Sequence, residues 1–364
     1  MAAPSSGAPI TREAIRSAPK ALLHDHLDGG LRVDTILDLA DSVGWTPNLP
    51  TTDRDELQAW FTAGAASADL LKYLATFEHT LAVMQSAENI RRVAREATED
   101  LAADGVVYGE IRFAPELHGL PLEEVVDAVA AGVRDGETAS GGTIEVNLIL
   151  CAMRTEQRSV EVARLVDAMR SREPKVVAFD LAGAETGWPP SLHAEALAFA
   201  RERHLNITIH ASEPPDLELI SDALAHGAHR IGHGVRLDRD TTLDGDGQLV
   251  LGSLARYVLD RGIHLEMAPT CNTQIGAVAS VADHPLVPFL RAGFNVGVNT
   301  DNRLMSDVSP SGEMWALHTE CGVDWTEIGR LVENAIASSF APVETRRRLL
   351  NEVVRPAYAT LAEA

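Results

Sequence analysis

The feature that most constrains the fold is an alternation between short apolar runs of β type and amphipathic stretches of helical length. Each run is rich in Val, Ile or Leu and ends at polar, Gly or Pro residues. Strands are expected at 21–27, 106–113, 144–153, 176–181, 207–210, 230–234, 263–267 and 296–299. Parallel strands joined by helical crossovers produce this alternation, and eight such units close a barrel. The sequence therefore predicts an α/β fold, a (β/α)8 TIM barrel.

Helical patterns fill most of the intervals between these strands. Crossover helices are expected at 122–137, 160–172, 192–204, 217–226, 249–261 and 285–292. The interval between the first two strands is longer than one crossover needs, and it contains helical patterns at 33–43, 70–84 and 88–103. We interpret this interval as a helical cap inserted after the first strand, at about 33–103.

The end of the chain adds further helices to the repeat. Helical patterns at 311–321, 327–339 and 344–361 follow the last expected strand. No low-complexity linker interrupts the sequence, so residues 1–364 are expected to form a single decorated barrel domain. The sequence leaves the oligomeric state open.

The balance of charge limits the partners of the chain. There are 53 Asp+Glu against 31 Lys+Arg, which gives a formal net charge of −22. Because phosphate backbones and anionic membranes require basic surfaces, nucleic-acid and membrane partners are not expected. A neutral, cationic or small ligand is expected instead.

Cysteine usage and the N-terminal sequence bear on location. The three cysteines, Cys151, Cys271 and Cys321, are too far apart for a disulfide framework or a Cys-x-x-Cys metal site. Residues 1–20 lack the apolar core of a signal peptide, and no stretch is apolar enough to cross a membrane. A cytoplasmic location is therefore expected.

Histidine and acidic residues gather at the C-terminal ends of the expected strands, which is the face that carries the active site of a β/α barrel. His24 and His26 end the first strand, where the period of two points both imidazoles to one side. His210 ends the fifth strand, and Asp301 ends the eighth. Three imidazoles and one carboxylate suit zinc, with water in an open position, so these four residues are the candidate ligands.

Two further residues at this face are candidates for acid–base chemistry. Glu213 lies on the loop that leaves the fifth strand, where partial desolvation would raise the pKa of its carboxyl enough for general acid work. His233 stands between two glycines after the sixth strand, and a histidine there can hold a metal-bound water or take its proton. Glu213 can also be interpreted as an ordinary acidic loop residue, and His233 as an ordinary turn residue.

The ordered set of motifs resembles the adenosine deaminase family, within the metal-dependent hydrolase superfamily. The resemblance rests on Leu-His-Asp-His-Leu-Asp-Gly-Gly-Leu-Arg at 23–32, Phe-Asp-Leu-Ala-Gly-Ala-Glu at 179–185, His-Ala-Ser-Glu at 210–213, Arg-Ile-Gly-His-Gly at 230–234 and Asn-Thr-Asp-Asn at 299–302. It implies one zinc ion per subunit and the hydrolytic deamination of adenosine and 2′-deoxyadenosine to inosine and deoxyinosine plus ammonia, in purine salvage.

The resemblance also implies a role for each residue. His24, His26, His210 and Asp301 correspond to the zinc ligands. His233 corresponds to the residue that orients the attacking water, and Glu213 to the acid that protonates N1 of the purine. The implied substrate contacts are His26, Asp28 at the ribose hydroxyl, Gly183 at N3 and Asn302 at N7.

Two positions depart from the pattern of the family. Asn302 replaces the second of two consecutive aspartates, and its amide can donate to the purine N7 acceptor without a protonation step. Ser212 replaces a glycine, and its hydroxyl is expected either to bond Glu213 or to narrow the pocket.

These departures keep other functions open. One is deamination of a modified adenine nucleoside of the aminofutalosine type or of free adenine. The other is a non-catalytic barrel that only binds a partner, although the complete set of ligands and the acid argues against it.

Overall fold

The computed structural model describes residues 8–67, 70–213 and 216–363. Eight parallel strands pair in the order β1-β2-β3-β4-β5-β6-β9-β10. Their bounds are β1 (Lys20–His26), β2 (Val106–Phe113), β3 (Glu145–Met153), β4 (Val176–Ala182), β5 (Asn206–Ala211), β6 (Arg230–His233), β9 (His264–Met267) and β10 (Val296–Val298). All eight strands expected from the sequence are confirmed, with ends that differ by a few residues.

The barrel closes where its first and last strands meet. Just beyond β10, Asp301 forms a parallel bridge with Asp25 of β1. The amide of His26 donates to the carbonyl of Asp301 at 2.7 Å, and the amide of Asp301 donates to the carbonyl of His24 at 3.0 Å. The seam of the barrel therefore runs between the residues that the sequence predicts as metal ligands.

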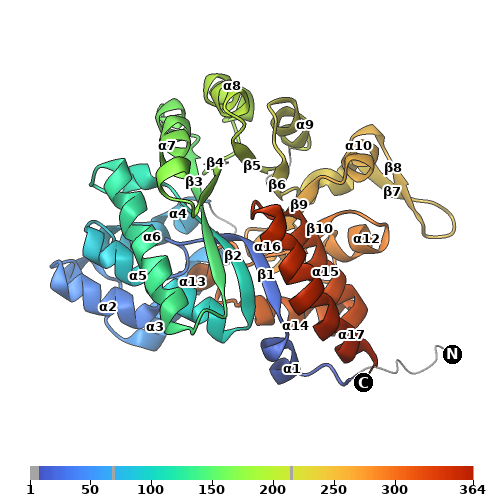
Figure 1. Ribbon diagram of the computed structural model, residues 1–364, viewed down its shortest axis with the longest axis horizontal. Helices are drawn as coiled ribbons and strands as arrows, with labels where there is room; N and C mark the ends of the chain where they lie inside the picture. The colour runs from blue at the N-terminus through green and yellow to red at the C-terminus, as the bar shows by residue number, and fades with distance from the viewer. Residues whose placement is uncertain (1–7, 68–69, 214–215, 364) are drawn as a thin grey trace.

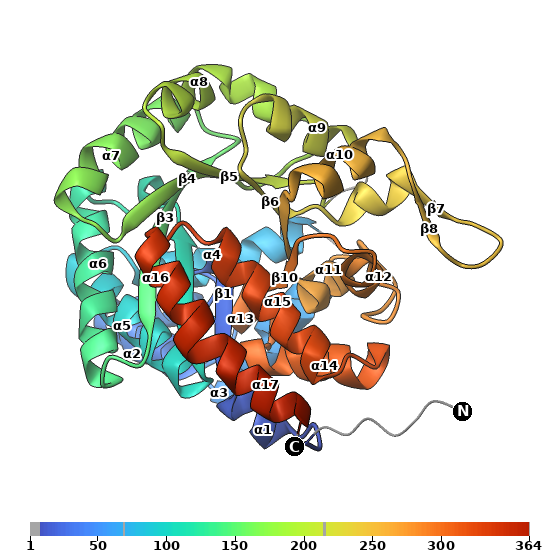
Figure 2. The same cartoon turned by 45° about the vertical axis from the view of Figure 1, so that its right-hand side comes forward.

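Helices cover the outside of the strands (Figure 1, Figure 2). The covering helices are α5 (Ala87–Ala103), α6 (Leu122–Ala139), α7 (Ser159–Arg172), α8 (Ala194–Glu202), α9 (Glu218–Ala225), α10 (Ser253–Arg261), α12 (Leu286–Arg291) and α15 (Trp325–Ser338). Each buries an apolar face, as an amphipathic helix against a sheet must. The last of them, α15, contacts both β10 and β1 and so covers the seam.

The long interval between β1 and β2 is helical, as the sequence predicts. It contains α2 (Val33–Ser42), α3 (Arg54–Ala65) and α4 (Leu70–Val83) before α5. Helix α3, which the sequence does not predict, packs on α13 (Arg303–Ser306), the short helix that follows β10. Gln58 of α3 donates its amide to the carbonyl of Leu304 at 3.0 Å. The α2–α4 segment is thus joined to the C-terminal end of the barrel.

The prediction of one helix over 249–261 is wrong at its beginning. Leu249–Leu251 is strand β8, paired antiparallel with β7 (Thr241–Leu243) in a hairpin that projects at the right of Figure 2. The Asp244 carboxylate accepts hydrogen bonds from the amides of Asp246 and Gln248, which stabilises the tight turn. Gly252 then separates β8 from α10.

Two other predicted helices are interrupted. The stretch 192–204 begins within a 3-10 helix, Pro190–His193, which has Pro189 at its N-cap, and α8 starts only at Ala194. The stretch 344–361 is divided into α16 (Val343–Arg348), a π-helical segment (Leu349–Val354) and α17 (Arg355–Glu363). The expected helix at 311–321 is confirmed as α14 (Pro310–Cys321).

Three short helices carry too little periodicity to be predicted. They are α1 (Arg12–Ser17), α11 (Pro269–Gln274) and α13. Across the described residues, no helix combines the length and the apolar character that a bilayer crossing requires.

Helices α5 and α6 approach so closely that only glycine fits at two points of their interface. A β-carbon on Gly132 of α6 would lie 2.8 Å from the side chain of Ala94 and would overlap the carbonyl oxygen of Arg91, both in α5. A carbonyl of a helix backbone cannot swing aside as the end of a side chain can. Gly136, one turn further along α6, is in the same situation, with Thr98 and the carbonyl oxygen of Arg95 in the way of a β-carbon, so the close approach of these helices depends on both glycines.

We therefore expect Gly132→Ala to lower the free energy of unfolding by about 1–3 kcal/mol, because overpacking outweighs the better helix propensity of alanine. Urea denaturation measures this change. Gly245→Ala is the matched control, since its β-carbon would meet no atom within 4 Å, and it should change the stability by less than about 0.5 kcal/mol. A Gly132→Ala protein as stable as the parent would contradict this account of the interface.

Candidate active site

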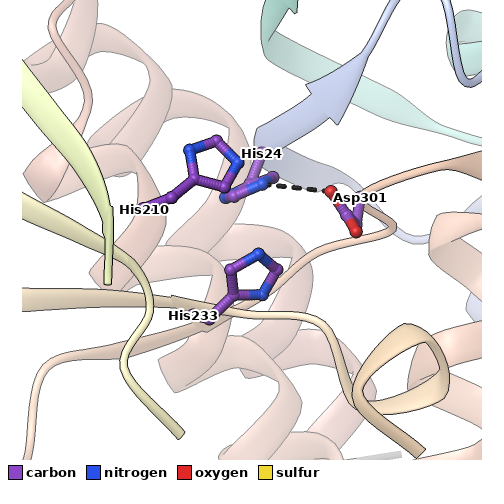
Figure 3. A group of neighbouring side chains, drawn as sticks. All are labelled: His24, His210, His233 and Asp301. Carbon is purple, nitrogen blue, oxygen red and sulfur yellow. Dashed lines mark ion pairs between the residues drawn. The ribbon is translucent and has the colours of Figure 1, made fainter. Parts of the chain in front are cut away.

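Four buried side chains converge at the C-terminal end of the barrel (Figure 3). His24 comes from β1, His210 from β5, His233 from the end of β6, and Asp301 from the turn after β10. One ligand atom of each lies within 4.8 Å of those of the other three. This spacing allows the four groups to contact a single metal ion.

His26 belongs to the same cluster. Its Nε2 lies 3.2 Å from Nε2 of His210 and 3.4 Å from Oδ1 of Asp301. The structure therefore brings together all four residues that the sequence predicts as ligands, and it adds His233 beside them. Burial, followed by the neighbouring imidazoles, lowers the pKa of His233 well below its ordinary value, which keeps that ring neutral and able to accept a proton or bind a metal.

The cluster fits a divalent metal ion of borderline softness. Its donors are imidazole nitrogens and one carboxylate, the set that such ions prefer. The Nε2 atom of His24 is buried without a hydrogen bond, although Oδ1 of Asp301 lies 3.2 Å away. A buried nitrogen left without a partner in this position is satisfied when it binds an ion at the centre of the cluster.

Carboxylates behind the histidines set their orientation. Nδ1 of His24 lies 3.0 Å from Oε2 of Glu266, and Nδ1 of His210 lies 3.1 Å from Oδ2 of Asp180. In metal sites, such carboxylates fix the imidazole tautomer and direct the other ring nitrogen at the ion. Arg112 donates to both carboxylates, at 2.6 Å to Glu266 and 3.0 Å to Asp180. One guanidinium thereby aligns two of the candidate ligands.

Glu213 lies beside the cluster in a position suited to proton transfer. Its Oε1 accepts a hydrogen bond from Nδ2 of Asn272 at 3.0 Å and lies 3.7 Å from Nδ1 of His233. Burial first, and then the negative charges of Asp301 and Glu185, raise the pKa of Glu213 well above its ordinary value. A bound cation would offset the contribution of Asp301, but burial and Glu185 would still favour the protonated acid.

Glu185 holds the loop that carries this acid. Its carboxylate accepts hydrogen bonds from the amides of Ser212, at 2.7 Å, and Glu213, at 3.4 Å. The hydroxyl of Ser212 donates instead to the carbonyl of Asp216 at 2.6 Å. Of the two roles expected for Ser212, a bond to the carboxyl of Glu213 is therefore not the one formed here.

Three residues at the strand ends adopt the left-handed backbone conformation without being glycines. The φ angles are 66° at Ser212, 62° at His233 and 58° at Asp301. This conformation costs a residue with a side chain about 1–2 kcal/mol. Such strain clusters at functional sites, and here it bends each chain sharply where the strand ends and the site begins.

The predicted substrate residues surround the cluster. Asp28 is buried, and its Oδ1 has no hydrogen-bond partner and lies 4.0 Å from Nδ1 of His26. Burial, and then the charges of Asp301 and Asp25, raise the pKa of Asp28 to about 7. Gly183 follows β4 with φ of 90°, and a β-carbon there would lie 2.9 Å from the end of Met153. Nδ2 of Asn302 donates to the hydroxyl of Tyr73, and its Oδ1 is unpartnered.

Several residues that shape the site were assigned no role from the sequence. Asp180 and Glu185 lie within the recognised motif at 179–185 but had no role assigned. Arg112 and Glu266 each interrupt an apolar strand with a charge, a signal that could have marked them. Tyr73 and Asn272 carry no comparable local signal, because they reach the site from helices α4 and α11.

The model of the family described as "Adenosine deaminase" matches residues 19–356. The chain belongs to the adenosine deaminase family. A relative in Mycobacterium sp. (strain KMS), named adenosine deaminase, is 50% identical over 361 residues, which cover 97% of this chain and 99% of the relative. A relative in Mycobacterium marinum with the same name is 50% identical over 358 residues, or 96% of this chain and 98% of that protein.

Solved structures of this family share the fold. The crystal structure of an adenine deaminase from Arthrobacter aurescens aligns with a TM-score of 0.80 and 29% identity, covering 93% of this chain and 98% of that one. The family consists of metal-dependent deaminases, hydrolases that act on C–N bonds, and the His/Asp cluster is able to hold the metal.

A metal bound by this cluster should stabilise the folded chain. We expect a strong chelator to lower the melting temperature by about 5 °C or more, because the chain loses a ligand that binds only its native state. Differential scanning fluorimetry before and after re-addition of the metal measures the shift. His210→Ala is the control, since it should melt at the same temperature with and without chelator; a chelator-insensitive parent protein would contradict the assignment.

Proposed function

We propose that this chain catalyses the zinc-dependent hydrolytic deamination of adenosine and 2′-deoxyadenosine to inosine and deoxyinosine, with release of ammonia, in purine salvage. The observation that carries the proposal is the position of Glu213, a partly buried acid of raised pKa, next to a His/Asp cluster in a member of this family. The chain would act in the cytoplasm as a single barrel domain with one zinc ion.

Zinc suits the donor set, and His24, His26, His210 and Asp301 would hold it. When bound, it supplies a positive charge that lowers the pKa of a water molecule in the site. We assign His233 to proton transfer, because its Nδ1 lies 3.7 Å from Oε1 of Glu213 and 3.2 Å from Nδ2 of Asn272. As a neutral ring it orients that water and accepts its proton while the oxygen attacks C6 of the purine.

Glu213 supplies the proton that makes the purine reactive. Protonation of N1 draws electrons from C6 and allows the ring to accept the oxygen nucleophile. A carboxyl whose pKa is raised by burial is suited to donate this proton, and Asn272, which contacts both side chains, keeps the Glu213 carboxyl next to His233. The amino group then gains the proton that His233 took from the water and leaves C6 as ammonia, while the new C6 hydroxyl gives its proton to Glu213 as the carbonyl forms.

The remaining candidates would bind the nucleoside. The Asp28 carboxylate, with its buried unpartnered oxygen, would accept a hydrogen bond from a ribose hydroxyl. The amide of Gly183 would donate to N3, and the amide of Asn302 to N7. A small neutral nucleoside is compatible with the net charge of −22. Because of the same negative charge, we propose no nucleic-acid or membrane partner.

Free adenine is the second candidate substrate. A solved relative 29% identical to this chain is named adenine deaminase. Asp28 favours a substrate with a sugar, because a bare base would leave its buried carboxylate without a partner.

A spectrophotometric deamination assay across adenosine, deoxyadenosine, adenine and an aminofutalosine-type nucleoside tests this choice. We expect the two nucleosides to give a kcat/KM at least about tenfold above that of adenine, because only they satisfy Asp28. Asp28→Ala should lower turnover of the nucleosides and leave that of adenine unchanged. A preference for adenine in the parent protein would reject the adenosine assignment.

Glu213→Gln should lower kcat for adenosine by at least about a hundredfold, because the amide cannot donate an acidic proton to N1. Zinc content, measured by atomic emission, should remain at one ion per chain. Glu195→Gln, which removes an exposed carboxylate on α8, is the matched control and should leave kcat unchanged. Near-normal turnover by Glu213→Gln would remove this residue from the mechanism.

A further inference from the structure

A tyrosine from the inserted helices reaches into the site. Tyr73 lies on α4, and its hydroxyl forms hydrogen bonds with Asn302, next to the metal-ligand candidate Asp301, and with Cys271 of α11. These contacts join α4 to two residues at the C-terminal end of the barrel.

The carboxylate of Asp301 sets the direction of these bonds. A carboxylate only accepts, so the Cys271 thiol donates its proton to Oδ2 of Asp301, 2.8 Å away. The sulfur then accepts from the hydroxyl of Tyr73, which has a single proton to give. The oxygen of Tyr73 is left to accept from Nδ2 of Asn302. The resulting series of hydrogen bonds runs from Asn302 through Tyr73 and Cys271 to Asp301.

This series of hydrogen bonds fixes the orientation of the Asn302 amide. The ends are nearly equal in size, so hydrogen-bond partners alone decide which of them faces a given neighbour. The nitrogen is held at Tyr73 and keeps a second N–H to donate. The oxygen lies on the side of Gly29, where any β-carbon would overlap it, and it finds no partner among the described residues.

We propose that Tyr73 is a positioning residue that determines base specificity, by locking the Asn302 amide in the orientation that offers N–H to the purine N7. The inference rests on the proposed adenosine deaminase function. Without the hydroxyl, the amide is free to turn and to present its carbonyl oxygen to N7, where two acceptors repel each other. Recognition of the base thereby becomes conditional on the docking of α4 against the barrel.

Tyr73→Phe tests this role, because it removes the hydroxyl and keeps the ring that packs 5.6 Å from the ring of Phe77. The substrates are adenosine and 7-deazaadenosine, which differ only in the N7 acceptor. The parent protein should prefer adenosine by at least about tenfold in kcat/KM. In Tyr73→Phe, we expect kcat/KM to fall about tenfold for adenosine and to stay within about twofold for 7-deazaadenosine, because only adenosine uses the bond.

A double-mutant cycle identifies the residue through which Tyr73 acts. If Tyr73 works through Asn302, the pair Tyr73→Phe and Asn302→Ala should lose no more activity on adenosine than Asn302→Ala alone. Tyr257→Phe, which removes an exposed hydroxyl on α10, is the matched control and should change neither substrate. Equal losses on the two substrates, additive losses in the cycle, or a parent protein indifferent to N7 would each overturn the proposal.

Hydrogen exchange provides a readout that needs no activity. Loss of the hydroxyl should speed exchange of the α4 amides severalfold, with unchanged zinc content, whereas Tyr257→Phe should leave α4 unaffected. If the parent protein deaminates no nucleoside, the proposed function fails, and unchanged exchange in α4 would overturn the hydrogen-bonded link separately.

Discussion

The site depends on one buried cation, the guanidinium of Arg112. It binds the carboxylates of Asp180 and Glu266, which in turn orient His210 and His24. A buried ion pair gains little stability after desolvation, but the removal of one partner leaves an unpaired charge that costs about 3–5 kcal/mol. Glu266 also binds Arg230 at 2.6 Å, so the same charges that position the ligands fill the interior of the barrel. The same network of ion pairs therefore fills the interior of the barrel and orients the histidines of the site.

This arrangement explains why acidic and basic residues lie inside a barrel that aliphatic side chains usually fill. Arg230 binds Glu110 through Nη2 at 2.7 Å and Glu266 through Nε at 2.6 Å, and its guanidinium lies 3.8 Å from the centre of the Phe340 ring. Rotation of any one member would leave its neighbours unpaired in a medium of low dielectric constant. The network therefore resists small displacements, which keeps imidazoles at fixed distances before any ligand arrives.

The sequence predicts the parts of the molecule that depend on local periodicity. The alternation of runs locates all eight strands, and the strand ends locate His24, His210 and Asp301. It misassigns 249–251 because a short apolar run next to a helix has the same composition in either conformation, and only the turn at 244–248 pairs it as a strand. Contacts such as that of Tyr73 with Asn302 arise from tertiary packing, so no local pattern encodes them.

The seam between β1 and β10 has a consequence for how the protein is made. The hydrogen bond from Thr300 to the carboxylate of Asp25 spans 275 residues, and the candidate ligands come from both sides of this seam. A ribosome that has synthesised the first strand must add most of the chain before Asp301 emerges to meet it. During translation the early histidines lack their partner carboxylate. All the candidate ligands are therefore present together only after Asp301 has been synthesised and the barrel has closed along this seam.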